Sequence, residues 1–159
     1  MRDPGHPDLA KATSTLGMLL YERGEYDEAV PVLEAAVQLH ATRSPLSAEL
    51  GAAVSELANA HFYAGNYDVA DSLNQRALAI HTQVFGDRHP RVADDLINIG
   101  AVRFQRAEYT EAERYYREGL SIVEPWFGPD HFRTGMALTM LGRALVFQDR
   151  YPDATESLT

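Results

Sequence analysis

The sequence predicts an all-α solenoid, in which antiparallel helix pairs stack one upon the next. A short turn phrase recurs four times along the 159 residues at a nearly fixed interval. Apolar residues at helical spacing lie on both sides of each copy. Turns of about three residues join the two helices of a pair, and such short turns leave room only for an antiparallel arrangement.

The turn phrase reads GEYDEA at 24–29, GNYDVA at 65–70, AEYTEA at 107–112 and RYPDA at 150–154. Its alanines stand at 29, 70, 112 and 154, so the intervals are 41, 42 and 42 residues. A feature that returns at a fixed interval indicates a repeat architecture. We expect these alanines at close helix crossings, because a small side chain lets two helices approach.

Each copy of the turn phrase separates two helices. In the first copy, Leu16, Gly17 and Leu20 share one helix face before the turn, and Ala29 and Leu33 begin a second face after it. Glycine at 24 and 65 is expected to end the first helix of its pair in a left-handed conformation. The predicted helices are seven full ones and a short eighth, at 8–23, 27–42, 46–64, 68–85, 90–106, 110–127, 132–148 and 152–159.

These helices group into four repeats within one array that covers residues 1–159. The repeats run approximately over 6–43, 46–86, 88–128 and 130–159. The last one is expected to be incomplete, because YPDATESLT stops about eight residues into a second helix that should continue for two or three turns.

Composition narrows the classes of partner. The formal net charge is −9, from 23 acidic and 14 basic residues, which argues against nucleic acid or an anionic membrane and leaves a basic peptide compatible. The absence of cysteine excludes disulfides, thiolate zinc sites and cysteine nucleophiles. No window has the apolar length of a signal peptide or a membrane span, so we expect a cytoplasmic protein.

Histidines recur in the loops between repeats, as in GDRHPRVADDL at 86–96. His6, His89 and His131 hold similar loop positions, and loops of neighbouring repeats are at least about 8 Å apart, too far to share a metal ion. We therefore expect structural loops, with His89 at a helix cap or in the last loop position and Pro90 in the first helical turn. His40 and His81 are expected near helix ends that favour a partly positive imidazole.

The repeat phrase resembles the tetratricopeptide repeat, whose pattern includes Leu-Gly, a large residue, Gly-x-Tyr-x-x-Ala and a later alanine. The 42-residue period, best seen in HPRVADDLINIGAVRFQRAEYTEAERYYREGLSIVEPWFG, is similar to the kinesin light chain variety. The resemblance covers nearly the whole chain. It implies a right-handed superhelical solenoid whose first helices line a concave groove.

In that groove, counting back from the turn alanine selects the residues that point inward. Eight positions before it stand Tyr21, Phe62 and Phe104, which would form an aromatic stripe, with Val146 in the fourth copy. Aromatic residues flanked by polar groups are typical of peptide-binding hot spots. The alternative is that the stripe packs one first helix against the next. The candidate groove residues are Tyr21, Asn59, Phe62, Asn98, Phe104 and Arg143.

A carboxylate clamp of the kind found in some tetratricopeptide domains is not expected. Asn98 alone matches the asparagine position of such clamps, where the other copies have Thr15, Glu56 and Met140. The lysine position is matched by Lys11 and by no other copy. This mismatch also weakens any transfer of kinesin light chain cargo recognition.

No phosphate loop, zinc-protease motif or nucleophile elbow is present, and Asp94 and Asp95 are expected on a solvated helix face. The sequence therefore predicts a non-catalytic scaffold without metal or cofactor, which binds a peptide or protein segment carrying basic and apolar anchors. The alternative is a sensor or scaffold fragment of a larger kinase, protease or transcription regulator.

Self-association is a further expectation, because Leu138, Leu141 and Leu145 should lack a complete covering helix. We expect a homodimer, or an exchange of elements between copies, through the carboxy-terminal end.

Overall fold

The computed structural model describes residues 7–158, and within this range the chain forms eight α-helices and no β-strand. Each predicted helix is present, with both ends within two residues of the prediction, so the all-α fold is confirmed. The helices are α1 (Pro7–Glu22), α2 (Tyr26–Arg43), α3 (Ala48–Tyr63), α4 (Tyr67–Phe85), α5 (Pro90–Gln105), α6 (Tyr109–Phe127), α7 (Phe132–Val146) and α8 (Tyr151–Leu158).

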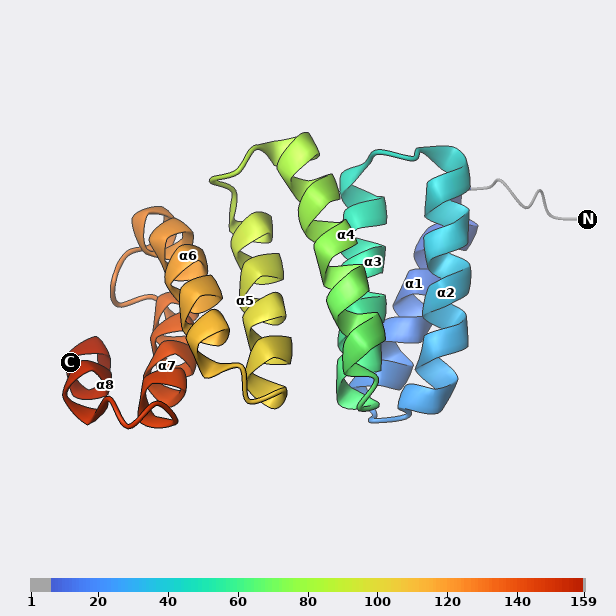
Figure 1. Cartoon of the computed structure of the whole chain (residues 1–159). Coiled ribbons are helices and arrows are strands. Elements are labelled where there is room, and N and C mark those ends of the chain that lie inside the picture. Colours follow the sequence, from blue (N-terminus) through green and yellow to red (C-terminus); the bar gives the residue numbers. More distant parts are fainter. Residues whose placement is uncertain (1–6, 159) are drawn as a thin grey trace, which may run out of the picture. The chain divides into compact units, whose positions relative to one another are not determined.

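The chain divides into two compact units, residues 1–84 and 85–159. In the first, α1 packs on α2 and α2 packs on α3, around a core that includes Leu33, Val37 and Leu57. In the second, α5, α6, α7 and α8 pack in sequence, with alternating directions that can be followed in Figure 1. The core between α6 and α7 is built on Tyr116 and Leu141. Whether the four repeats form one array stays a prediction.

The turns between paired helices have the expected geometry. Gly24 and Gly65 have φ angles of 78° and 82°, in the left-handed region that favours glycine. The same turn position is held by Ala107 and Asp149, each with a φ of 59°. The backbone therefore keeps the turn shape in all four copies, although two of them lack glycine. The turn alanines are all buried, as their place at helix crossings requires: Ala29, Ala70, Ala112 and Ala154.

The histidine loops cap the helices that follow them. The Nδ1 atom of His89 accepts a hydrogen bond of 3.2 Å from the backbone N–H of Arg91, and Pro90 is the first residue of α5. His131 makes the equivalent bond at the start of α7. The His89 ring also stacks on Phe85, with ring centroids 4.1 Å apart. The structural role predicted for these two loops is confirmed, whereas His6 lies outside the described residues.

The loop between the first two repeats uses a different cap. Ser47, not histidine, is the N-cap before α3, and its side chain accepts a hydrogen bond of 3.1 Å from the backbone N–H of Leu50. Serine is among the residues best suited to this position, because its short hydroxyl reaches a free N–H of the first turn. This explains how the loop functions without the glycine and histidine found in the later copies.

The acidic pair on α5 does not form a solvated face, and that expectation was wrong. Asp95 is buried, and Asp94 is half-buried. Arg133 on α7 donates to both carboxylate oxygens of Asp94, at 2.9 and 3.1 Å. Asp94 therefore takes part in the contact between the first helices α5 and α7, which the pattern of a single helix does not reveal.

The expectation for the charge of His40, near the end of α2, was also wrong. His40 is buried, and its Nε2 atom lies 3.2 Å from the hydroxyl of Ser14 on α1. Burial, and next the nearby Arg43, lower the pKa of His40 below its usual 6.5. The neutral ring is favoured, so the expected partial positive charge at this helix end is wrong.

The reason given for a carboxy-terminal dimer does not hold either. Leu141 and Leu145 are fully buried, and Leu138 is half-buried, so the uncovered leucine surface is not there. Tyr116 and the first turn of α8 cover that part of α7. The homodimer stays a prediction, without the residues on which it rested.

Two further findings concern the described part of the chain. None of its helices has the length and apolar character needed to cross a membrane. Its His, Asp and Glu side chains form no group of three or more that could hold a metal ion.

Candidate peptide-binding surface

The first-helix aromatic of repeat one lies in a cluster of three tyrosines at the helix turns. Tyr21 on α1 packs against Tyr26, the first residue of α2, with ring centroids 5.8 Å apart. Tyr63, the last residue of α3, meets Tyr21 edge-on at 5.6 Å and stacks on Tyr26 at 5.7 Å. Tyr63 keeps 56% of its surface exposed. The cluster is therefore packed on its inner side and open on its outer side.

Residues 85–158 contain an equivalent cluster. Phe104 on α5 packs edge-on against Tyr109 of α6 at 5.3 Å and against Phe147 at 5.1 Å. Phe147 follows α7 and is as exposed as Tyr63, at 56%. We call the trio of Tyr21, Tyr26 and Tyr63 the first aromatic cluster, and the trio of Phe104, Tyr109 and Phe147 the second aromatic cluster.

A cation lies on the second aromatic cluster. The guanidinium of Arg143, on α7, is 4.9 Å from the ring centre of Phe104. This distance suits a cation–π interaction, which holds a partly exposed arginine in place. The structure thus brings together two of the predicted groove residues from neighbouring first helices.

The remaining predicted residues lie on the same helices. Phe62 on α3 meets Tyr63 at 5.3 Å and Tyr67 at 5.5 Å, so it joins the first aromatic cluster through Tyr63. Asn59 is half-buried on α3, one turn before Phe62. Asn98 is half-buried on α5, less than two turns before Phe104. The groove role of these six residues stays a prediction.

Both original interpretations of the stripe have support in this geometry. Tyr21, Phe62 and Phe104 are each half-buried, and each touches aromatic neighbours on adjacent helices. They contribute to packing and also present ring surface to solvent. The most exposed rings of the clusters are their neighbours Tyr63 and Phe147.

Sequence reasoning missed Tyr63 and Phe147. Both stand seven residues before a turn alanine, one position after the predicted stripe, where the other copies have Glu22 and Gln105. The signal in the sequence was that two of the four repeat copies have an aromatic residue at this position. An alignment of the repeats reveals residues that most copies share, and this position differs between copies.

Burial changes the pKa of the Tyr21 phenol, which lies at the centre of the first aromatic cluster. Burial, and next the neighbouring Tyr63, raise the pKa of Tyr21 well above its usual value. The hydroxyl therefore stays protonated at any physiological pH. It can donate or accept a hydrogen bond, and it adds no negative charge to an already acidic chain.

Comparison with known families decides what these helix pairs are. Residues 9–42, 49–124 and 96–159 match the family described as Tetratricopeptide repeat. The chain belongs to the tetratricopeptide repeat family. Its two aromatic clusters thus lie near the short turns that join the two helices of a tetratricopeptide repeat.

Solved structures of such repeats share the fold over nearly the whole chain. BtubC (BKLC) from P. vanneervenii superposes on 99% of this chain with a TM-score of 0.87 and 18% identity, over 63% of its own length. A Podosopora anserina protein with nearly identical kinesin light chain TPR-like repeats gives 0.83 and 21% identity, over 74% of its length. The predicted helical solenoid of kinesin light chain-like tetratricopeptide type is confirmed.

Curated relatives are much longer proteins. A clustered mitochondria protein homolog from Emericella nidulans is 27% identical over 143 residues, which cover 88% of this chain and 12% of the relative. A homolog of the same name from Aspergillus clavatus is 26% identical over 141 residues. The chain thus spans about one ninth of the length of these relatives.

Proposed function

We propose that this chain is a non-catalytic protein-interaction module, which binds a peptide or protein segment on the first-helix side of its repeats. The observation that carries the proposal is the pair of half-open aromatic clusters, one in each unit. Rings that are fixed by packing on one side and open on the other lose little side-chain entropy when a ligand covers them. Tyrosine, phenylalanine and arginine are also suitable anchor residues.

The charge of the chain favours a partner with basic residues beside an apolar anchor. The net charge is −9, and the exposed rings of the clusters offer apolar surface within that acidic background. Arg143 adds one local positive charge, which suits an acidic or carbonyl group of the ligand near Phe104. We expect higher salt to slow association, because long-range steering by opposite charges weakens.

A second role is favoured by one specific observation, the length of the curated relatives. In them, the matching segment is only 11 to 12% of the protein. The module would then act as a sensor or scaffold segment of a larger protein. The nature of such a protein, and a cytoplasmic location for it, are predictions that a longer reading frame around this chain would test.

The groove hypothesis is tested by affinity capture with the full chain, read by quantitative mass spectrometry. Phe62→Ala combined with Phe104→Ala should deplete the specific partners, with a loss of about 2 kcal/mol in binding free energy for each ring. Phe132→Ala is the matched control, because Phe132 is 71% exposed at the opposite end of α7. That variant should retain the same partners as the wild type.

The packing alternative makes a different prediction for the same variants. If the rings serve only to pack neighbouring helices, the double variant should lose stability on the scale of buried phenylalanines, about 3 to 5 kcal/mol for each ring. Urea unfolding measures this loss. Partners retained equally by the wild type and by a folded double variant would refute the groove hypothesis.

A further inference from the structure

The two aromatic clusters have the same arrangement of rings. In the first, the ring centroid of Tyr21 lies 5.8 and 5.6 Å from the centroids of its two partners. In the second, the ring centroid of Phe104 lies 5.3 and 5.1 Å from those of its partners. In both clusters, the ring at the end of the next first helix meets the central ring edge-on. The neighbours of the two central rings can therefore be compared position by position.

The second aromatic cluster carries a cation of its own chain on the central ring. The guanidinium of Arg143 lies 4.9 Å from the ring centre of Phe104. Arg143 stands on α7, eleven residues before the turn alanine Ala154, and Phe104 stands on α5, eight residues before Ala112. The electron-rich face of an aromatic ring attracts a cation at this distance. The contact shows which chemical group this arrangement of helices accommodates on a central ring.

The first aromatic cluster has an uncharged residue at the position of that cation. Asn59 on α3 stands eleven residues before Ala70, so its register relative to Tyr21 is that of Arg143 relative to the second cluster. The asparagine amide is neutral, and it ends several bonds before the point that a guanidinium reaches. The chain therefore does not supply from α3 the cation that it supplies from α7.

The charge beside the central ring also differs between the clusters. Glu22 directly follows the central tyrosine and acts electrostatically on its phenol. Gln105 holds the same position in the second aromatic cluster, and both side chains are exposed. Arg23 is paired with Glu25 at 2.8 Å, which offsets its charge. The first cluster thus offers a carboxylate where the second has a neutral amide, and it has an amide where the second has a guanidinium.

We propose that the first aromatic cluster binds an arginine side chain of the partner. Its guanidinium lies on the Tyr21 ring and pairs with the Glu22 carboxylate. The contact of Arg143 with Phe104 is the example of this interaction within the same chain. Arginine suits the position better than lysine, because its planar group stacks on a ring while its N–H groups bond a carboxylate. The inference rests on the proposed function, since the arginine belongs to the bound peptide or protein segment.

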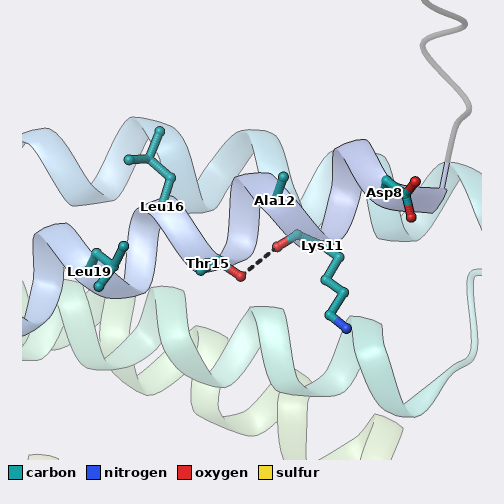
Figure 2. A pocket seen from close by; sticks show the side chains of 6 residues that line it. All are labelled: Asp8, Lys11, Ala12, Thr15, Leu16 and Leu19. Atoms are coloured by element: carbon teal, nitrogen blue, oxygen red, sulfur yellow. Dashed lines mark hydrogen bonds between the residues drawn. The ribbon is translucent and has the colours of Figure 1, made fainter.

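Another acidic position on α1 provides a matched control. An open hollow of about 390 Å³ lies along this helix, and Figure 2 shows the side chains that line it: Asp8, Lys11, Ala12, Thr15, Leu16 and Leu19. Its lining has one carboxylate, one ammonium group and no aromatic ring. A guanidinium gains little there, because the charge of Lys11 opposes it and no ring attracts it. Neutralising Asp8 should therefore leave arginine binding at the first aromatic cluster unchanged.

The probe for this proposal is N-acetyl-L-arginine amide, titrated into the intact isotope-labelled chain and followed by NMR. We expect saturable shifts at the backbone amides of Tyr21, Glu22 and Tyr63, with a dissociation constant roughly in the millimolar range, because a single cation–π contact and an exposed ion pair are both weak. Glu22→Gln should weaken binding about threefold or more. Asn59→Arg should abolish it, because the new guanidinium occupies the ring. Asp8→Asn should have no effect, and N-acetyl-L-lysine amide should bind more weakly than the arginine probe.

The reverse exchange tests the same geometry in the second aromatic cluster. Arg143→Asn combined with Gln105→Glu gives this cluster the neighbours of the first. The double variant should gain an arginine site, seen as new saturable shifts at Phe104 and Phe147. Both replaced side chains are exposed, so the variant should stay folded, which its circular dichroism checks.

The proposal is overturned if the arginine probe gives no saturable shifts at the first aromatic cluster, or if Glu22→Gln and Asn59→Arg bind it as well as the wild type does. It is also overturned if Asp8→Asn weakens binding as much as Glu22→Gln, since the acidic background alone would then attract the probe.

Failure of the arginine site and failure of the proposed function have different readouts. Affinity capture in which Asn59→Arg and Glu22→Gln retain every partner that the Phe62→Ala, Phe104→Ala variant loses would reject the arginine site and leave the proposed function standing. Capture in which that double phenylalanine variant retains all partners would refute the groove itself, whatever the probe shows.

Discussion

The ring of Tyr116 lies against the Cα of Gly100, where α6 crosses α5. A Cβ atom added at Gly100 would be 2.7 Å from Cε1 and 2.8 Å from Cδ1 of Tyr116. Tyr116 is 1% exposed, so its ring is enclosed by neighbouring side chains. The corresponding pair in repeat one is Gly17 and Leu33, which also approach too closely for a Cβ. Repeat two has Ala58 and Asn74 at these positions, a larger first residue with a smaller partner.

Gly100→Ala should destabilise the chain by about 1 to 3 kcal/mol, the usual cost of forcing extra volume into a packed core. The buried ring of Tyr116 must shift, because the added methyl group takes its space. Urea unfolding followed by circular dichroism measures the change. Adding Tyr116→Leu should recover part of the loss, since leucine fits beside glycine in repeat one.

Gly135→Ala is the matched control for this prediction. Gly135 also lies within a helix, but no atom stands within 4 Å of its added Cβ. Alanine has the higher helix propensity, so this variant should gain about 0.5 to 1 kcal/mol. Equal stability of the two alanine variants would contradict the close contact between Gly100 and Tyr116.

Ala107→Gly should stabilise the chain by roughly 0.5 to 1 kcal/mol. Ala107 has a φ of 59°, where a Cβ clashes with the backbone and glycine does not. The reverse change at the equivalent turn, Gly24→Ala, should destabilise by a similar amount, because Gly24 has a φ of 78°. Thermal and urea unfolding of both variants would test the pair, and a loss of stability in Ala107→Gly would rule out strain at this turn.

Glu113→Gln should destabilise residues 85–158 by about 1 to 3 kcal/mol. The Glu113 carboxylate accepts hydrogen bonds of 2.9 Å from Arg117, 3.0 Å from Gln148 and 2.7 Å from Arg150, and thereby joins α6 to the turn before α8. A neutral amide loses the charge-assisted part of this network. Glu111→Gln is the control, because its ion pair with Arg114 is exposed and should contribute less than about 1 kcal/mol.

The same carboxylate should make stability fall in acid. Burial alone would raise the pKa of Glu113, but the hydrogen bonds from Arg117, Gln148 and Arg150 outweigh it and lower the pKa below 4.5. A lowered pKa in the folded state gives stability that is present above the unfolded value and is lost as the pH falls through the folded one. Urea unfolding between pH 5 and pH 3 should show a smaller decline in Glu113→Gln.

His40 should produce a second decline at higher pH. Its folded-state pKa lies below 6.5, so the unfolded chain takes up the proton first. The free energy of unfolding should therefore fall as the pH drops from about 7.5 through 6.5 toward the folded-state pKa. His40→Gln, which keeps a polar group near Ser14, should flatten this part of the pH profile. An unchanged profile in that variant would assign the decline to other histidines.

The sequence alone was enough to predict the eight helices, their pairing and the family. These features depend on local patterns that recur in every copy: the turn tyrosines and alanines, the glycines at 24 and 65, and the proline after His89. Because the pattern occurs in four copies, it can be recognised even where one copy departs from it, as with Ala107 in place of glycine. The sequence placed His89 at the cap or in the last loop position before Pro90, and the structure shows that it forms the cap.

The candidate site was predicted less completely. Tyr21, Phe62 and Phe104 were found because most copies share an aromatic there, and Arg143 was found by its register. Tyr63 and Phe147, the most exposed rings of the aromatic clusters, were missed because only two copies carry them. Their importance depends on contacts with residues 37 to 43 positions away, which no local pattern contains.

Local periodicity and turn chemistry thus determined the helices and their order, because those interactions act within a few residues. The tertiary structure decided the burial of Asp95, the neutral state of His40 and the covering of Leu141, since each depends on which neighbouring helix removes water from that side chain. The same physical reason explains the exposure of Leu16 on α1. Leu16 and Leu57 share one register and one residue type, and only the presence of α2 beside α3 makes Leu57 core and leaves Leu16 exposed.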